Sequence, residues 1–301
     1  MCAALRAVRA DVLLSAQHFA NEVACLAGRL CRVPVVLSEH TTLSRDLSVC
    51  RRMSPRRLIP WIDRPIYGLA DAIVAVSDGV AADFSSLTGI PTARIHTIYN
   101  PVLPLGWRTG RAASAVHPWL AQKPMRTAVA MGRLHAQKDF STLIRAVAAE
   151  PCRDIRLVVF GIGEDRGKLT ALCASLGVTS RVCLAGFTPD PLGQLQRADV
   201  FVLSSRWEGL PTVLVEALAC GIPVVSTDCP SGPREILAGG RFGALVPVAD
   251  REALAAAIAR ACTAPTPRAP AEWIAQFRTE TVAARYVALF RKCLRKASAE
   301  P

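Results

Sequence analysis

Short apolar runs alternate along this chain with longer stretches in which apolar and polar residues mix at helical spacing. An apolar run bounded by polar or glycine-rich segments is typical of a strand buried in a sheet, and helices between such strands indicate βαβ units around a parallel sheet. We therefore expect an α/β fold. The first predicted strands are 11–14, 34–37, 72–76 and 95–98, with helices at 19–30 and 81–87.

The alternation stops from Pro101 to Arg126, where Pro, Gly, Ser and Arg prevail. Such a composition predicts a linker between two domains. A second alternating series begins after it, which predicts a second parallel sheet. Its strands are expected at 128–131, 155–160, 182–185, 200–203, 224–226 and 244–246.

The end of the chain differs from both series. A proline-rich stretch, 263–270, closes the second series, and one amphipathic helix is expected over 272–294. We therefore predict two Rossmann-like domains with parallel sheets and a C-terminal helix that packs back on the first domain. The predicted boundaries are 1–110, 111–270 and 271–301.

The composition supports packed cores and gives the chain a strong positive charge. With 301 residues, 51% of them hydrophobic, the chain can bury two sizeable cores. Its formal net charge of +12 suggests an acidic partner: a nucleic acid, an anionic lipid or a phosphorylated small molecule. The charge alone does not choose among these classes.

One segment concentrates arginines among apolar residues. It has two interpretations, a solvated helix face or a surface that docks on an anionic membrane. Nucleic-acid binding is a further hypothesis, but the segment lacks the aromatic stacking platform that such binding normally uses, so no nucleic-acid partner is expected. The arginines are Arg45, Arg51, Arg52, Arg56, Arg57 and Arg64.

The cysteines and the hydropathy indicate the compartment. Eleven cysteines are scattered without a C-x-x-C pair, which predicts free thiols in a reducing compartment. No apolar run approaches the roughly 18 residues of a membrane span, and the first residues do not form a signal peptide. A cytoplasmic protein is therefore expected, peripheral on the inner membrane face if the arginine segment docks there. No Asp-x-Asp triplet is present, so no metal site is predicted.

The most informative motif is a pair of glutamates, Glu208 and Glu216, on either side of a Gly-Leu-Pro turn. A predicted strand precedes the pair, and a predicted helix runs from Thr212 to Cys220 and ends at Gly221, a residue suited to the left-handed conformation. The motif therefore places Glu208 at the carboxyl end of a strand, where open α/β sheets bind ligands, and Glu216 about one turn into the helix. The alternative is a surface salt bridge and a helix–solvent contact.

Two glycine turns follow the first strands of the second series. Gly132 ends one strand, and Arg133 and Lys138 after it could clamp a diphosphate with two positive charges. Gly161 and Gly163 end the next strand and resemble half of a dinucleotide fingerprint. Arg166 stands where that fingerprint has its third glycine, which makes a dinucleotide-dependent oxidoreductase the weaker hypothesis.

In order along the chain, these motifs resemble the retaining GT-B glycosyltransferases of family 4, also called glycosyl transferases group 1. The resemblance covers most of residues 30–290 and implies a GT-B fold of two Rossmann-like domains, with the acceptor side in the first and the nucleotide-sugar in the second. The motifs that carry it are Gly132-Arg133-Leu134, Lys138-Asp139-Phe140, Gly161-Ile162-Gly163, Ala198 to Ser204, Glu208 to Leu218, Gly221 to Val225 and Gly243 to Val246.

The resemblance also implies roles. Arg133 and Lys138 match the basic pair that neutralises the donor diphosphate, Glu208 the carboxylate that contacts the donor sugar, and Glu216 the one that binds the ribose hydroxyls. His40, after a predicted strand of the first domain, matches a histidine near the sugar and acceptor, although a plain loop residue is the alternative. The remaining positions expected to hold the donor are Gly132, Gly161, Gly163, Gly209, Leu210, Pro211 and Thr212.

The implied activity is that of a retaining hexosyltransferase. The expected donor is a nucleotide-sugar, specifically a UDP-sugar, the acceptor is a glycan or a lipid-linked glycan, and no cofactor or metal is expected. The first domain is shorter than the family pattern and lacks its opening strand and glycine-rich loop, so we expect it to be incomplete. Either Met1 is a misassigned start or the chain is a truncated, inactive glycosyltransferase.

Overall fold

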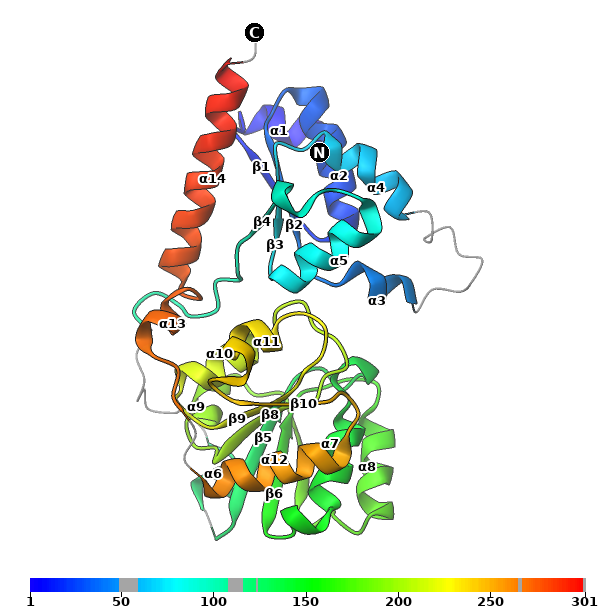
Figure 1. The fold of residues 1–301 in the computed structure, drawn as a ribbon, viewed down its shortest axis with the longest axis vertical. Helices are drawn as coiled ribbons and strands as arrows, with labels where there is room; N and C mark the ends of the chain where they lie inside the picture. Colours follow the sequence, from blue (N-terminus) through cyan, green and yellow to red (C-terminus); the bar gives the residue numbers. More distant parts are fainter. Residues whose placement is uncertain (49–58, 108–115, 123, 265–266, 300–301) are drawn as a thin grey trace. The chain divides into compact units, whose positions relative to one another are not determined.

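The computed structural model describes residues 1–48, 59–107, 116–122, 124–264 and 267–299. The chain divides into two compact units (Figure 1). The first unit comprises residues 1–101 and 276–301, and the second comprises residues 102–275. Each unit contains one parallel sheet with helices on both faces, which confirms the predicted α/β fold.

The first unit contains a four-stranded sheet in the order β1-β2-β3-β4. Every neighbouring pair is parallel, as expected where helices connect the strands. The strands are β1 (Leu13–Ala16), β2 (Val35–Glu39), β3 (Ala72–Ala75) and β4 (Ile95–Thr97). The helices are α1 (Cys2–Ala7), α2 (His18–Cys31), α3 (Leu43–Ser48), α4 (Ile59–Gly68), α5 (Asp78–Thr88), the 3-10 turn η2 (Thr92–Arg94) and α14 (Thr279–Ala299).

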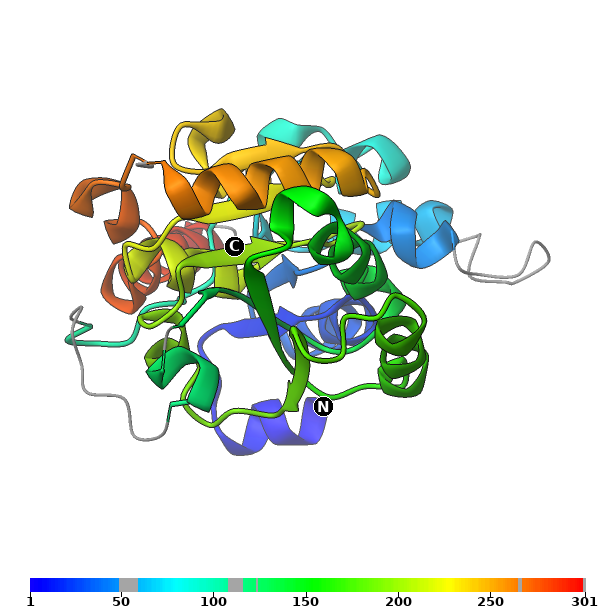
Figure 2. The same ribbon diagram turned by 90° about the horizontal axis from the view of Figure 1, so that it is seen from below.

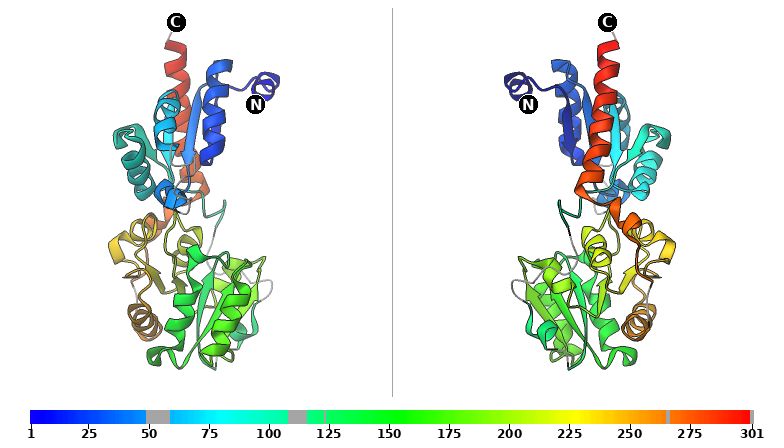
Figure 3. Two further views of the ribbon diagram at one scale, coloured as in Figure 1. Left: turned by 90° about the vertical axis from the view of Figure 1, so that its right-hand side faces the viewer. Right: turned by 90° about the vertical axis from the view of Figure 1, so that its left-hand side faces the viewer.

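The C-terminal helix α14 belongs to this first unit. Its buried residues Val282, Leu289 and Cys293 form one core with β2, β3 and the residue that follows β4. The Tyr286 hydroxyl lies 3.3 Å from Ser38 Oγ of β2, on the same face of the sheet. Figures 1 and 3 show α14, at the red end of the bar, running alongside the four-stranded sheet.

The second unit contains a six-stranded parallel sheet in the order β10-β9-β8-β5-β6-β7. Read from β7, this is the 3-2-1-4-5-6 order of the doubly wound Rossmann fold. The chain moves outward from β5 through β6 to β7 and then returns to the other side of β5, so β5 and β8 flank the switch point. The strands are β5 (Arg126–Met131), β6 (Ile155–Phe160), β7 (Val182–Gly186), β8 (Val200–Leu203), β9 (Val224–Thr227) and β10 (Ala244–Val246).

Helices cover both faces of this sheet. Three helices, α7, α8 and α12, contribute buried residues to one core with β5, β6, β8 and β9 (Figure 2). The α-helices of the unit are α6 (Pro118–Ala121), α7 (Phe140–Ala148), α8 (Arg166–Ser175), α9 (Pro191–Leu195), α10 (Thr212–Ala219), α11 (Pro233–Ile236), α12 (Arg251–Thr263) and α13 (Ala271–Ala275). Its 3-10 turns are η3 (Ala136–Lys138), η4 (Glu150–Cys152) and η5 (Ala238–Gly240).

All ten predicted strands form, with ends shifted by no more than a few residues. The end of the predicted linker was wrong. The second unit already begins at Val102, and within the predicted linker Leu120 of α6 is buried and the Arg156 guanidinium lies 5.0 Å from the centre of the Trp119 ring.

The single C-terminal helix was also wrong, because two helices form. Trp273 of α13 donates its ring N–H to the Ile236 carbonyl of the second unit, whereas α14 packs in the first. The helical pattern therefore breaks where the chain passes between the units, at Ala275 and Gln276. Phe277, just after the break, is buried against Tyr99.

Two predictions concern membranes. In the part of the chain that the structure describes, no helix combines the length and apolar character needed to cross a bilayer. Of the six arginines in the segment proposed to dock on an anionic membrane, the structure describes Arg45, within α3, and Arg64, within α4. Arg51, Arg52, Arg56 and Arg57 lie outside the described residues, so membrane docking stays a prediction.

Candidate functional site

The loops that follow β5 and β8 meet at the switch point of the second unit. Parallel strands on either side of a switch point send their connections to opposite faces, which leaves a crevice at their carboxyl ends. The β5 loop carries Gly132, Arg133 and Lys138, and the β8 loop carries Glu208. Side chains far apart in the sequence are thereby brought to one sheet edge.

Hydrogen bonds fix these two loops to each other. The Arg206 backbone N–H donates to the Gln137 carbonyl at 2.8 Å, and the Gln137 side chain donates to the Trp207 carbonyl at 2.9 Å. Ser204 Oγ donates to the Lys138 carbonyl at 2.7 Å. Because both loops are held by each other's backbone, their side chains are positioned before any ligand binds.

Lys138 and Glu208 form an ion pair at the centre of this edge. Lys138 Nζ lies 2.6 Å from Glu208 Oε1, and the exposed fractions of the two side chains are 17% and 7%. Ser205 Oγ donates to the same carboxylate oxygen at 2.6 Å. A lysine ammonium has three N–H donors, so two remain for other acceptors. Glu208 Oε2 makes no hydrogen bond with any residue the structure describes.

Glycines allow the β5 and β6 loops to approach closely. A Cβ on Gly161 would lie 1.8 Å from the Gly132 carbonyl oxygen, and one on Gly163 would lie 2.3 Å from the Leu134 carbonyl oxygen. The close approach lets Leu134 N–H donate to the Ile162 carbonyl at 2.9 Å. The half-fingerprint identified in the sequence therefore joins two loops at the site.

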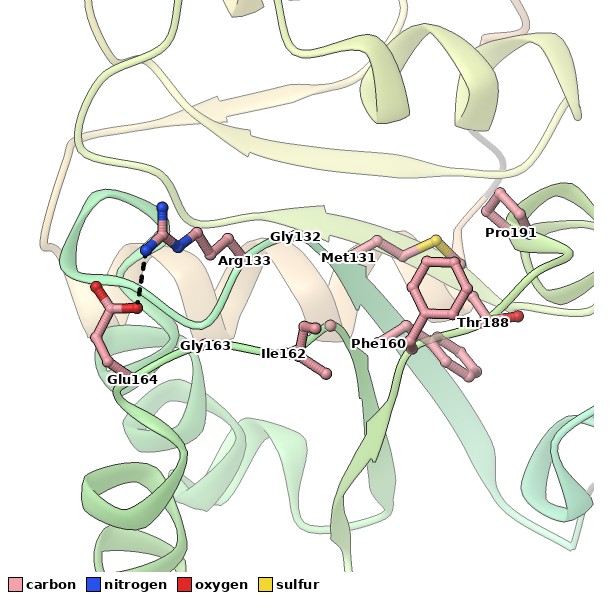
Figure 4. Close-up of a pocket in the computed structure, with 11 residues that line it drawn as sticks. Met131, Gly132, Arg133, Phe160, Ile162, Gly163, Glu164, Thr188 and Pro191 are labelled. Carbon is pink, nitrogen blue, oxygen red and sulfur yellow. Dashed lines mark hydrogen bonds and ion pairs between the residues drawn. The ribbon is translucent and has the colours of Figure 1, made fainter.

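A pocket of about 730 Å³ opens beside these loops, at the carboxyl ends of β5, β6 and β7 (Figure 4). Arg133 and Glu164 face each other at one end of it, with Arg133 Nη2 3.3 Å from Glu164 Oε2. Apolar side chains form much of the remaining wall. The lining residues are Met131, Gly132, Arg133, Phe160, Gly161, Ile162, Gly163, Glu164, Phe187, Thr188 and Pro191.

The apolar wall of this pocket was not predicted from the sequence. Ile162 is 63% exposed and Phe187 is 74% exposed, unusually high fractions for large apolar side chains at a sheet edge. A signal was present, since Phe187 lies two residues after a predicted strand and an apolar residue there has no strand partner to cover it. Such side chains suit a flat ring that binds between them.

Glu216 lies on α10 in a partly buried position without a hydrogen-bond partner for its carboxylate among the described residues. Burial raises the pKa of this carboxyl above its ordinary value. Its charge contributes, after burial, to raising the pKa of the Cys220 thiol to about 12. A desolvated acceptor of this kind gains most from a ligand that donates hydroxyl hydrogens to it.

The turn between the two glutamates packs tightly against the β9 loop. Gly232 has a positive φ of 89°, and a Cβ there would lie 2.5 Å from Pro211 Cδ. Pro211 precedes α10, which begins at Thr212, so the first amides of that helix have no intrahelical acceptor. Gly209 and Leu210 complete the turn, with Leu210 buried. Gly221 adopts a φ of 72° after the helix, as its sequence position predicted.

His40 lies in the other unit. It follows β2, and its Nε2 is 3.1 Å from Ser38 Oγ. Burial lowers the pKa of its imidazole, although the Glu39 carboxylate acts in the opposite direction. The structure therefore places His40 at a carboxyl strand end, as predicted, but its contact with sugar or acceptor stays a prediction.

The side chains gathered at this edge of the second unit could bind an anionic group and a ring. Lys138 and Arg133 offer positive charge, Glu208 and Glu216 offer acceptors for hydroxyl groups, and the apolar wall offers a surface for a ring. Residues 117–278, which span this whole arrangement, match the family model described as glycosyl transferases group 1. This chain is a member of that family. Residues 2–103 match the model described as Glycosyltransferase Family 4.

Relatives of this chain include two named glycosyltransferases. The lipopolysaccharide core biosynthesis glycosyltransferase LpsE of Rhizobium meliloti is 34% identical over 230 residues, which cover 70% of this chain and 66% of the relative. A Campylobacter jejuni enzyme, N-acetylgalactosamine-N,N'-diacetylbacillosaminyl-diphospho-undecaprenol 4-alpha-N-acetylgalactosaminyltransferase, is 36% identical over 183 residues, covering 61% of this chain and 48% of the relative. Matches to the first three curated relatives span from 27% to 66% of their length.

Solved glycosyltransferase structures share the fold. The structure of Anabaena Alr3699/HepE in complex with UDP matches with a TM-score of 0.75 and 20% identity, covering 97% of this chain and 82% of that chain. Sucrose-phosphate synthase from Thermosynechococcus elongatus matches with a TM-score of 0.79 and 19% identity, covering 98% of this chain and 76% of that chain. The GT-B fold expected from the sequence is confirmed.

Proposed function

We propose that this glycosyltransferase moves a hexose from a UDP-sugar to a glycan or lipid-linked acceptor and retains the anomeric configuration. The observation that carries the proposal is the Lys138–Glu208 pair, held at the switch point beside the pocket of the second unit. This pair supplies a cation and a carboxylate side by side, on loops that hydrogen bonds hold to each other. A nucleotide-sugar has the matching groups, a diphosphate and a sugar, next to each other.

The nucleoside would occupy the pocket. Its base would lie against Ile162 and Phe187, whose exposed side chains offer flat apolar contact. The ribose hydroxyls would donate to the Glu216 carboxylate, which has no partner among the described residues. The UDP named in the structure of Anabaena Alr3699/HepE supports uridine as the nucleoside.

The diphosphate would lie between Arg133 and Lys138. Lys138 would keep its bond to Glu208 Oε1 and direct its other two N–H groups to phosphate oxygens. Arg133, which is 72% exposed, would leave Glu164 and bind phosphate in a bidentate manner. Amides of the 209–213 turn would add donors, and the α10 dipole adds partial positive charge there.

In the proposed reaction, the acceptor hydroxyl attacks the anomeric carbon from the face that UDP leaves. The bond between that carbon and the phosphate oxygen breaks, UDP takes the electron pair, and a donor phosphate oxygen takes the acceptor proton. Lys138 and Arg133 stabilise the charge that develops on the leaving group, and Glu208 Oε2 holds a sugar hydroxyl. Catalysis then consists of positioning and electrostatic stabilisation, without a cofactor.

The acceptor is proposed to bind to the first unit, with His40 as one contact. The names of the curated relatives support an acceptor of the cell envelope, since they include lipopolysaccharide and diphospho-undecaprenol enzymes. Work at the cytoplasmic face of a membrane, with the chain bound peripherally, would fit a lipid-linked acceptor.

UDP binding and turnover test the proposal in two steps. Calorimetry with UDP should show one site, and a panel of UDP-sugars should release UDP in the presence of a lipid or glycan acceptor extract. Lys138→Met and Glu208→Gln should each lower turnover by about a hundredfold or more, because each removes transition-state stabilisation. Glu150→Gln, a change at an exposed carboxylate in η4, is the matched control.

Three outcomes separate the alternatives. Turnover that is unchanged in Lys138→Met and Glu208→Gln would remove both residues from the mechanism. Tight UDP binding without turnover of any donor would favour the inactive glycosyltransferase. Proton NMR of the first product formed reports the anomeric configuration, and inversion would refute the retaining mechanism.

A further inference from the structure

A second cluster of chemically active side chains lies in the first unit, apart from the proposed donor site. His18 and Glu22 lie one turn apart on α2, and Asp63 lies on α4. One ligand atom from each lies within 4.8 Å of the other two. His18 Nε2 is 3.3 Å from Asp63 Oδ2 and 3.7 Å from Glu22 Oε1.

The buried atoms of this cluster lack hydrogen bonds. Asp63 is 0% exposed, and both of its carboxylate oxygens, together with His18 Nε2, have no hydrogen-bond partner among the residues that the structure describes. Within the described residues, no lysine or arginine forms an ion pair with Glu22 or Asp63. Burying polar atoms that make no hydrogen bond is costly, so these atoms point to a further partner of positive charge.

The other ring nitrogen of His18 faces a carboxylate. His18 Nδ1 is 3.6 Å from Glu39 Oε1 and 3.5 Å from the Tyr67 hydroxyl. Glu39 is itself held in place, because it accepts hydrogen bonds from the Tyr67 hydroxyl and, at 2.7 Å, from Asn21 Nδ2. A histidine that binds a metal through one nitrogen usually directs its other nitrogen to such a fixed carboxylate.

We propose that His18 Nε2, Glu22 and Asp63 bind one divalent transition-metal ion, Zn²⁺ or Mn²⁺, which cross-links α2 to α4. Ligands about 2.0 to 2.2 Å from a common ion lie roughly 3 to 3.6 Å apart, close to the two separations measured here. One imidazole nitrogen with carboxylate oxygens suits these ions, whereas Mg²⁺ and Ca²⁺ prefer oxygen alone. Glu22, 27% exposed, marks the side from which the ion enters.

No motif in the sequence indicates this site. His18 and Glu22 are four positions apart, but a histidine and a glutamate at that spacing are common on helices, and Asp63 lies far away in the chain. The proposed ion does not depend on UDP or on turnover, so its test is independent of the proposed glycosyltransferase activity.

Metal binding is measured on the full chain with Mn²⁺ by equilibrium dialysis and with Co²⁺ by visible absorption. We expect about one ion per chain, and weak visible bands without the intense near-ultraviolet band that thiolate ligands give. His18→Gln and Glu22→Gln should each weaken binding by about tenfold or more. Glu280→Gln, an exposed carboxylate on α14 of the same unit, should bind as the wild type does.

Each result decides for or against the site. Loss of the ion in His18→Gln and Glu22→Gln, with the wild-type circular dichroism spectrum, supports it. If His18→Gln does not fold, the partly exposed Glu22→Gln carries the test. No bound ion in the wild type, equal binding in all variants, or a thiolate band that persists in both variants would overturn the proposal. If the wild type binds no ion, His18 and Asp63 share a proton instead.

Discussion

At the scale of single residues, the two glutamates of the motif have opposite surroundings. Glu208 is buried, but its carboxylate accepts hydrogen bonds from both Lys138 and Ser205. Glu216 has no such donor among the described residues, and burial raises the pKa of its carboxyl. An unpaired, partly buried acceptor lowers stability, which is the usual cost of a binding group that waits for its ligand.

This difference predicts how stability depends on pH. Because the pKa of Glu216 is higher in the folded chain than in the unfolded chain, folding favours the protonated form, and this contribution is lost as pH rises through the raised pKa. Glu216→Gln should therefore melt at a higher temperature than the wild type near pH 8, and the gap should close towards about pH 4. Thermal unfolding over a pH series measures both.

The control for this pH series has the opposite sign. Glu252 is exposed, and the hydrogen bond from the Arg251 side chain lowers the pKa of its carboxyl. Glu252→Gln should bring a small loss of stability above the ordinary pKa of a glutamate and none below it. UDP affinity should fall in Glu216→Gln and stay unchanged in Glu252→Gln. If the difference in melting temperature between Glu216→Gln and the wild type did not change with pH, the raised pKa of Glu216 would be contradicted.

At the scale of elements, the site depends on how closely two strand-to-helix connections pack. The β5 and β6 loops touch through backbone atoms at Gly132 and Gly161, which leaves no room for a side chain. The β5 loop in turn carries Arg133 and Lys138. Any change that separates the two loops therefore moves both cations.

A matched pair of glycine substitutions tests this packing. Gly161→Ala would place a Cβ 1.8 Å from the Gly132 carbonyl oxygen, so it should cost about 1 to 3 kcal/mol of stability and weaken UDP binding. Gly167→Ala, on α8 with nothing within 4 Å of the added Cβ, should instead gain up to about 1 kcal/mol from helix propensity. Denaturant unfolding and UDP calorimetry compare them. Equal effects of the two substitutions would refute the packing argument.

At the scale of the whole molecule, each unit has its own sheet and its own core, and the chain passes between the units near residues 101 and 276. The proposed nucleotide contacts all lie in the second unit, whereas His40 and the proposed metal ligands lie in the first. The two ligands should therefore act on different parts of the chain.

Hydrogen exchange can locate these effects. UDP should slow amide exchange in the loops after β5, β6 and β8, because binding there removes local opening. Strands β1 to β4 should exchange as before at saturating UDP. Mn²⁺ should instead protect α2 and α4. Protection by UDP that was confined to the first unit would contradict the proposed donor site. The Glu150→Gln variant is again the control and should show the same protection as the wild type.

Candidate site residues could be named from the sequence, but their contacts could not. The family resemblance implied a ligand for Lys138 and for Glu208, whereas their mutual ion pair follows from β8 lying next to β5 in the sheet. The half-fingerprint glycines were identified as a turn, and the structure adds that they permit a backbone contact. Phe187 and Thr188 were not predicted as pocket residues. They follow β7, and only the order of strands in the sheet shows that the end of β7 lies near the ends of β5 and β6.

Local pattern alone therefore determined the ten strands, the two parallel sheets and the family, because apolar runs, glycine turns and helix signals act between residues close in the chain. Tertiary structure decided which strand ends meet, where the C-terminal helix breaks, and which polar groups are buried without partners. Sheet order and burial depend on contacts between distant segments, and a single sequence carries no local signal for them. The cluster of His18, Glu22 and Asp63 is the clearest case, since nothing in the sequence around His18 and Glu22 indicates Asp63.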